Sequence, residues 1–297
     1  MSGTILAIGE VMGELRRDAD GGFALGFAGD TYNAAVYAKR ADPSLTVAYR
    51  TAIGSDPLSA ALLDAAAAEG IDMSRTVRHP TRNLGLYAVT TDRAGERSFH
   101  YWRESSAARA MFEDGVGGLD GADVILLSGI TLAILPPPDR DALLAALAAH
   151  PATVAYDGNH RPRLWDGDDA ARAATEAAFR MADIALPSLD DLAALWGDDE
   201  AAALRRLAAW GCTRGALKCG DGGPVGLDGD RPDGLDPAPR VVDTTAAGDS
   251  FDGAFLAAHM DGEDDLAAMR AGHAMARTVV QHPGAIVPHA ATDAGCA

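Results

Sequence analysis

The sequence predicts an α/β fold in which helices cover both faces of a mostly parallel sheet. Short apolar runs alternate with longer Ala-rich segments along most of the chain, and such alternation is typical of βαβ units. With 297 residues, of which 48% are hydrophobic, the chain can bury a sizeable core, and we expect one large domain spanning 1–297. In such sheets ligands lie at the carboxyl ends of the strands, so the chemistry is expected in the residues that follow strands.

Each element is predicted from its local pattern. Apolar or β-branched runs predict the buried strands, and Ala-rich segments bounded by Asp, Gly or Pro predict the helices. The expected strands are 4–9, 47–53, 123–129, 153–157, 183–187 and 216–220, with a further strand end at 241–242. The expected helices are 31–41, 56–69, 139–150, 168–182, 200–210 and about 247–259.

A small β flap is expected outside the main core. The polar turn 18–22 joins two strands of a hairpin, and 84–91 and 96–103 flank a second turn at 92–95. In the last arm, large rings at Phe99 and Tyr101 alternate with other residues, which predicts one covered and one solvated face. We therefore place lid segments at about 12–28 and 83–105, inserted into the single domain.

Composition excludes several classes of partner. The formal net charge of −18 repels nucleic acids and anionic membranes, so neither is an expected partner. The three cysteines, Cys212, Cys219 and Cys296, are odd in number and widely spaced, which argues against a disulfide framework. No signal peptide and no apolar run of about 18 residues is present, so a cytoplasmic location is expected.

The most informative segment is 243–256, in which small residues lead into a helix. Such a turn lets backbone N–H groups approach an anion closely, and the helix dipole adds to the attraction. Asp249 lies in the first turn of this helix, where we expect it to be ionised at neutral pH. It can then accept a proton from a hydroxyl that attacks a phosphate. The alternative is that Asp249 is only a first-turn or capping acid.

This segment resembles the second signature of the PfkB, or ribokinase-like, sugar kinases. The resemblance implies a ribokinase-like three-layer sandwich with a small β-sheet lid, and ATP as the phosphate donor. It also implies that Asp249 is the catalytic base and that the amides of Ala246, Ala247 and Gly248 bind the transferring phosphate. Most members carry glycine in place of Ala246, but a branch that phosphorylates keto-deoxy sugar acids tolerates alanine there.

The resemblance extends along nearly the whole chain. Residues 29–33 are similar to the glycine motif that binds sugar hydroxyls, which implies this role for Gly29, Asp30 and Asn33. An Asp30 that merely caps a helix is the alternative.

Two further segments are similar to the parts of the family that meet the nucleotide. Lys218, Gly220 and Gly223 belong to a strand and turn that resemble those in contact with ATP. Gly284 lies in a segment similar to the closing loop near the nucleotide.

Metal binding is implied with less support from the residues. Relatives often carry an Asn-x-x-Glu motif that helps to place Mg²⁺, whereas 188–191 reads Ser-Leu-Asp-Asp here. Asp191 can hold the metal through water, as hard oxygen ligands do. A monovalent cation near Asp243 and Thr245 is left open.

Arginines point to an acidic substrate. Tyr101 and Arg103 are two residues apart and so lie on the same side of a strand, and Arg161 and Arg163 follow the strand 153–157. Arginine binds a carboxylate through two parallel hydrogen bonds, a partner that a neutral sugar does not need. The alternative is that these arginines pair with surface acids.

The segments 85–87, 95–103 and 157–165 together resemble 2-keto-3-deoxygluconate kinases. By that likeness Arg103 and Arg163 hold the substrate carboxylate, and Tyr87 and Tyr101 pack against and hydrogen-bond its chain. The implied reaction converts 2-keto-3-deoxygluconate and ATP to the 6-phosphate and ADP. A homodimer or higher homo-oligomer through the lid is also implied. The alternatives are a kinase of the same fold for fructose or ribose, and a sugar-sensing protein without catalysis.

Overall fold

The computed structural model describes residues 3–17, 21–91 and 97–293. Its main sheet has five parallel strands in the order β11-β10-β9-β1-β4. The chain winds outward from β1 to β4 and then returns to the other side of β1, so the switch point lies between β1 and β9. The strands are β1 (Thr4–Ile8), β4 (Thr46–Arg50), β9 (Val124–Ser128), β10 (Thr153–Asp157) and β11 (Ile184–Ala185).

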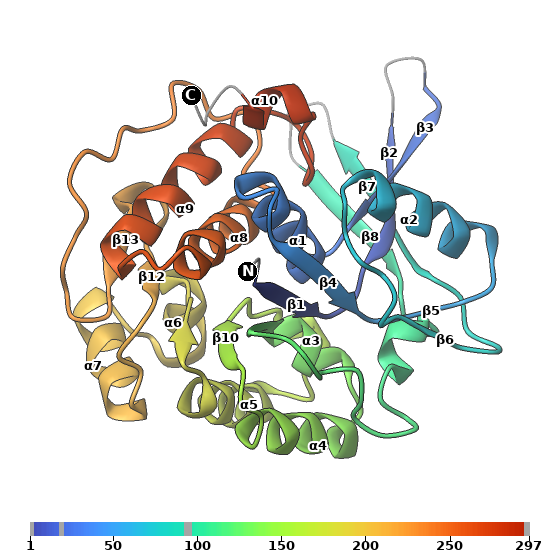
Figure 1. Cartoon of the computed structure of the whole chain (residues 1–297), viewed down its shortest axis with the longest axis horizontal. Coiled ribbons are helices and arrows are strands. Elements are labelled where there is room, and N and C mark those ends of the chain that lie inside the picture. The colour runs from blue at the N-terminus through green and yellow to red at the C-terminus, as the bar shows by residue number, and fades with distance from the viewer. Residues whose placement is uncertain (1–2, 18–20, 92–96, 294–297) are drawn as a thin grey trace.

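Helices cover both faces of this sheet, which confirms the predicted α/β sandwich (Figure 1). The two faces of β1 show why: Leu6 and Ile8 pack into one apolar cluster, and Ile5 and Ala7 into the other. The helices on one face are α1 (Asp30–Ala41), α2 (Pro57–Ala68), α8 (Ala247–Met260) and α9 (Asp265–Val279). Those on the other are α3 (Gly129–Ile134), α4 (Pro137–Ala148), α5 (Asp168–Met181), α6 (Leu189–Trp196) and α7 (Glu200–Trp210).

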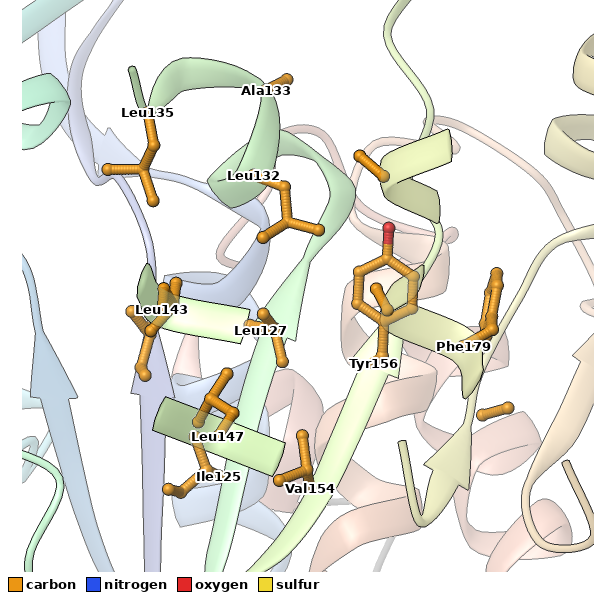
Figure 2. Packing of buried hydrophobic residues seen from close by; sticks show 14 of the residues in the cluster. Ile125, Leu127, Leu132, Ala133, Leu135, Leu143, Leu147, Val154, Tyr156 and Phe179 are labelled. Carbon is orange, nitrogen blue, oxygen red and sulfur yellow. The ribbon is translucent and has the colours of Figure 1, made fainter. Parts of the chain in front are cut away.

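The core under α4 and α5 is close-packed and apolar. Figure 2 shows Ile125 and Leu127 of β9 beside Leu143 and Leu147 of α4. These four side chains are almost completely buried. Burial of this kind dominates the stability of the fold and holds the strand ends in fixed positions.

Close packing of α1 and α8 depends on a glycine. A Cβ at Gly253 would overlap the carbonyl oxygen of Ala34, so only glycine lets the two helices approach this closely. The approach brings the first turn of α8 against the first turn of α1. It therefore sets the distance between Asp249 and Asn33.

The predicted lid segments form one separate four-stranded sheet, in the order β3-β2-β7-β8 (Figure 1). Its strands β2 and β7 are parallel, and both outer pairs are antiparallel. Residues 18–20 and 92–96 of the two predicted turns lie outside the described residues. The strands are β2 (Met12–Arg17), β3 (Phe23–Ala28), β7 (Gly85–Thr91) and β8 (Arg97–Trp102).

Some sequence-based expectations were wrong. The predicted strand 47–53 divides at Thr51 because β5 (Ala52–Ile53) leaves the main sheet to pair with β6 (Val77–Arg78). No strand forms at 241–242, where the amides of Val242 and Asp243 both donate to the carbonyl of Val280.

The expectation that β8 has one covered face was also wrong. Tyr101 is 50% and Trp102 59% exposed although they point to opposite faces, so both faces of this edge strand remain open.

The remaining elements complete the chain. Isolated parallel bridges from β11 and from Ser188 continue the main sheet toward β12. These elements are β12 (Ala216–Lys218), β13 (Pro224–Gly226), α10 (His289–Asp293) and the 3₁₀ helices η1 (Ala107–Ala110), η2 (Pro162–Leu164) and η3 (Gly220–Gly222). Across the described ranges, no helix combines the length and apolarity needed to cross a bilayer. Cys212 and Cys219 are free thiols, and Cys296 lies outside the described part of the chain.

Candidate active site

A cavity of about 1930 Å³ lies between the lid and the carboxyl ends of the main strands. Pockets for one small ligand usually span roughly 300–1,000 Å³, so this cavity has room for two substrates. Most of the predicted site residues line it: Gly29, Asp30, Asn33, Tyr87, Tyr101, Arg103, Arg163, Asp191, Lys218, Gly220, Ala246, Ala247, Gly248 and Asp249. The fold thus brings together residues that are far apart in the sequence.

Two predicted nucleotide contacts lie elsewhere. Gly284 lines a smaller neighbouring cavity of about 420 Å³, with Arg16 and Thr245. The amide of Gly284 donates to Asp243 Oδ2 at 2.6 Å, which ties this loop to the start of the anion-binding turn. Gly223 follows η3 and lines neither cavity.

Asp249 is the third residue of α8, and its carboxylate is held on one side only. Asn33 Nδ2 donates to Asp249 Oδ2 at 2.7 Å. The other carboxylate oxygen has no hydrogen-bond donor within the described residues. A base needs this arrangement, because one oxygen fixes the orientation while the other is left to receive a proton.

The pKa of Asp249 is raised to about 7, chiefly by burial and then by the neighbouring carboxyl of Asp30. The hydrogen bond from Asn33 and the charge of Lys218 oppose this rise. The expectation of a fully ionised Asp249 at neutral pH is therefore corrected. The helix dipole does not offset the loss of water around the carboxylate.

The N-terminus of α8 presents unpaired amides to the cavity. Its cap, Ala246, has a left-handed backbone with φ 60°, a conformation uncommon for a residue other than glycine. Ala247 N donates to the carbonyl of Thr244 at 3.2 Å, so this predicted anion contact is already used. The amides of Ala246, Gly248 and Asp249 find no acceptor in the part of the chain that the structure describes, as is usual in a first helical turn.

Asp30 is fixed beside this turn, but it is not the helix cap. Gly29 is the cap of α1, and a Cβ there would overlap the carbonyl of Glu10. Asp30 Oδ2 accepts from Asn159 Nδ2 at 3.0 Å, and Asn159 has a left-handed φ of 30°. Burial, the largest influence, raises the pKa of the Asp30 carboxyl. Backbone strain at a non-glycine residue next to a ligand site often accompanies function, yet Asn159 was missed because a left-handed backbone at a non-glycine residue leaves no mark in one sequence.

Lys218 is enclosed by two carboxylates. Its Nζ lies 3.1 Å from Asp157 Oδ1 and 2.8 Å from Asp252 Oδ2. Burial lowers the pKa of Lys218, but the charges of Asp157 and Asp252 outweigh it and raise that pKa overall. The predicted contact of Lys218 with ATP thus starts from an ammonium group that is already paired. Asp252 follows Asp249 by three residues, a helical spacing that could have indicated its place on the same face.

Side chains of a different kind, arginines and tyrosines, line the lid side of the cavity. Arg103 forms a buried ion pair with Glu10, and its Nε is buried without a partner in the described structure. The Arg103 guanidinium also lies 5.6 Å from the ring centre of Tyr101. Arg163, on η2, is exposed and forms no ion pair with any described residue.

Tyr87 anchors the inner face of the lid. Its hydroxyl donates to Glu14 Oε2 at 2.7 Å, and its ring centre lies 5.7 Å from that of Tyr101. The two rings form an apolar wall, and the hydroxyl of Tyr87 keeps only its lone pairs for a substrate.

The carboxyl group of Asp191, in the first turn of α6, meets only part of what a metal site requires. Ser188 caps α6 by accepting from Asp191 N at 3.1 Å. Burial, and after it the charge of Asp157, raises the pKa of Asp191. The described residues contain no group of three His, Cys, Asp or Glu side chains arranged for a metal. One or two crowded carboxyls suit Mg²⁺ that arrives with a phosphate ligand and keeps several waters.

Together, the doubly covered parallel sheet, the unpaired helix amides and the adjacent carboxylate define a protein built like a small-molecule phosphotransferase. The chain belongs to the pfkB family of carbohydrate kinases, which it matches over residues 3–292. This confirms the resemblance drawn from the sequence.

Known proteins support the same placement. The chain is 40% identical to the 2-dehydro-3-deoxygluconokinase of Escherichia coli K12 over 99% of its own length and 100% of the relative. A crystal structure of a PfkB protein from Polaromonas sp. JS666 has a TM-score of 0.84 and 25% identity, with 99% of each chain covered. Fructokinase from Vibrio cholerae O395, solved with fructose, ADP and calcium, has a TM-score of 0.82 and 21% identity, again over 99% of each chain, which shows the shared fold.

Proposed function

We propose that this carbohydrate kinase transfers the γ-phosphoryl group of ATP to the 6-hydroxyl of 2-keto-3-deoxygluconate. The observation that carries the proposal is the position of Asp249, with one free carboxylate oxygen beside unpaired amides, in the same cavity as Arg103 and Arg163. The 40% identical relative carries this activity in its name. As one domain of residues 1–297 with an inserted lid, the chain would bind both substrates in that cavity.

In the proposed reaction Asp249 is the general base. The substrate oxygen forms a bond to the γ-phosphorus while the bond from that phosphorus to the bridging oxygen of ADP breaks. The hydroxyl proton passes to the free oxygen of Asp249, whose other oxygen stays bonded to Asn33. A carboxylate with a pKa of about 7 suits this task, because it is deprotonated in a large share of molecules yet still basic.

Charge that develops on the transferring phosphate would be stabilised by backbone amides. Those of Ala246, Gly248 and Asp249 point from the helix start and need no reorganisation during the reaction. Gly248 has no side chain that would crowd a phosphate approaching these amides. Lys218 is close by, since its Nζ would lie 3.6 Å from a Cβ atom built on Gly248. We propose that Lys218 and Gly220 border the nucleotide, and that Gly223 and Gly284 shape its outer loops.

The sugar would be held at both ends. Gly29 and Asp30 would meet hydroxyls near the reacting end, whereas Arg103 and Arg163 would bind the carboxylate. Tyr101 would cover the carbon chain from the lid side. Closure of the lid over the cavity would exclude water and so limit ATP hydrolysis.

ATP is proposed as the donor, with Mg²⁺ near Asp191. The structural neighbour from Vibrio cholerae was solved with ADP and calcium, which is consistent with a nucleotide and a divalent cation in this fold. When bound, Mg²⁺ would neutralise phosphate charge. Asp191 would hold it through water, and Asp157 stays paired with Lys218.

A dimer through the lid is also proposed. The outer face of the lid sheet exposes Phe23 by 57%, Leu25 by 44% and Trp102 by 59%. Strand register places these three side chains on the face away from Tyr87 and the cavity. A second copy offers the same apolar face, so two lids can pair about a two-fold axis. Trp102→Glu should convert a dimer to a monomer in light scattering; a wild-type monomer at micromolar concentration would contradict this proposal.

The expected cytoplasmic location stays a prediction.

A substrate panel tests the proposed function. Purified protein, ATP and Mg²⁺ are incubated with 2-keto-3-deoxygluconate, fructose or ribose, and ADP release is measured with mass detection of the sugar phosphate. We expect the keto-acid to be used with the highest kcat/KM and to gain phosphate at its 6-position. A preference for fructose or ribose would support the alternative of a neutral-sugar kinase. No ADP release with any sugar would support the alternative of a sugar-sensing protein without catalysis.

A further inference from the structure

Three side chains at intervals of three residues, Arg103, Ser106 and Arg109, lead from the end of β8 into η1, and we refer to them as the ladder. Ser106 N donates to the carbonyl of Arg103 at 3.0 Å, and Arg109 N donates to that of Ser106 at 3.3 Å. Ser106 Oγ accepts from Ala108 N at 3.2 Å and so fixes the start of the short helix. The side chains of Arg103 and Ser106 both contact Glu10. Arg103 and Arg109 both line the large cavity.

The charges on this ladder are not balanced equally. Glu10 is only 2% exposed. Its carboxylate forms an ion pair with Arg103 and accepts a hydrogen bond from the hydroxyl of Ser106. The positive charge of Arg103 is thus largely cancelled before a substrate arrives. Arg109 is half-buried, and its guanidinium group pairs with no carboxylate or carbonyl group within the described ranges.

An unpaired, partly desolvated guanidinium is unusual in a chain with a net charge of −18. Its charge is less screened than that of the exposed Arg163, so it attracts an anion in the cavity more strongly. Arg103, locked by Glu10, contributes direction more than net charge, because its remaining N–H groups are fixed in space.

We infer that Arg109 is a specificity-determining residue that contacts the carboxylate of the sugar acid and supplies the uncancelled positive charge of that subsite. Arg103, positioned by Glu10, orients the same carboxylate. The inference rests on the proposed function, since it names a further residue for recognition of the acid end of that substrate.

The test compares Arg109→Ala and Arg109→Lys with a matched control, Arg205→Ala, which removes one exposed arginine from α7 outside both cavities. Arg109→Ala should raise KM for 2-keto-3-deoxygluconate about 10- to 100-fold, the cost of losing a charge-assisted contact. Its kcat and its KM for ATP should stay within about threefold, which a misfolded variant would not show. Arg109→Lys should recover part of the lost affinity because the charge is kept, and Arg205→Ala should match the wild type.

The salt dependence of kcat/KM provides a second test of the charge at Arg109. Added KCl should lower kcat/KM for the keto-acid in the wild type and in Arg205→Ala, and lower it less in Arg109→Ala. An unchanged KM in Arg109→Ala, or a parallel loss of affinity for ATP, would overturn the inference while leaving the proposed function intact. Absence of keto-acid turnover in the wild type would overturn both.

Discussion

The two ends of the cavity are built differently. At the base end, Asp249, Asp30 and Lys218 are each held by partners from α1, α8, the main strand β10 or the loop that directly follows β10. At the acid end, Arg163 and Tyr101 are exposed and come from a short 3₁₀ helix and an edge strand of the lid. In the proposed function the residues of the chemical step therefore belong to the rigid core. The proposed recognition residues belong to surface elements that can differ between relatives without disturbing that core.

The two ends also differ in how strongly burial affects their charged groups. Burial at the base end raises the pKa of Asp249 to about 7, whereas the exposed Arg163 at the acid end keeps solvent around its guanidinium group. A substitution at the base end should therefore change kcat and its pH dependence. A substitution at the acid end should change KM for the substrate and its salt dependence.

The largest effect is expected from Asp249→Asn. Asparagine keeps the shape and the contact with Asn33 but cannot accept the proton, so kcat should fall by about 10²- to 10⁴-fold. KM for ATP should change little. The matched control is Asp261→Asn, which changes an exposed aspartate just beyond the far end of α8. Near-normal turnover of Asp249→Asn would remove the assigned base.

Arg103→Ala tests the acid end and its buried support. Use of the keto-acid should fall by about 10²-fold in kcat/KM, with little change for a neutral sugar. The variant should also lose roughly 3–5 kcal/mol of unfolding free energy, because Glu10 stays buried without its partner.

The double variant Arg103→Met/Glu10→Gln separates these two effects. It should recover much of the stability, since no unpaired charge remains, but none of the keto-acid activity. Denaturant unfolding and kinetics are measured on the same preparations. Recovery of activity together with stability would show that Arg103 serves only the fold.

A smaller effect is expected from Asn33→Ala. The lost hydrogen bond no longer lowers the pKa of Asp249, so that pKa should rise. At pH 7 kcat should fall about tenfold, and part of the loss should return at pH 8.5, where the carboxyl is again ionised. A loss that is the same at both pH values would assign Asn33 to substrate contact instead.

The smallest effect concerns stability. The Asp249 pKa is higher in the folded chain than the usual 3.8, so its ionisation opposes folding as the pH rises from about 4 to 7, and the full cost is present above 7. Asp249→Asn should thus raise the melting temperature by about 2–4 °C at pH 8 and by less at pH 4.5. A lower melting temperature at pH 8 would contradict the pKa.

Local patterns were sufficient to predict much of the fold. The alternation of apolar runs and Ala-rich segments indicated β1, β9, β10 and their flanking helices because both periods are short-range. The end of the strand at 47–53 and the absent strand at 241–242 were missed, since pairing with β6 and with Val280 is decided by distant residues.

The candidate site divides in the same way. The position of Asp249 at a helix start is local and could be predicted from the sequence. Its raised pKa could not, because it depends first on burial in the folded chain and then on the carboxyl of Asp30, more than 200 residues away in the chain. The partners of Lys218 and the ion pair of Arg103 with Glu10 are likewise long-range contacts that spacing alone does not reveal.

The most direct measurement is the pH dependence of kcat with 2-keto-3-deoxygluconate, for the wild type and for Asp249→Asn. The wild-type rate should rise with pH through a midpoint near 7, as the Asp249 carboxyl ionises. The residual rate of the variant should show no rise there. A variant that kept the same midpoint would show that another group takes the proton, and the assignment of Asp249 would be wrong.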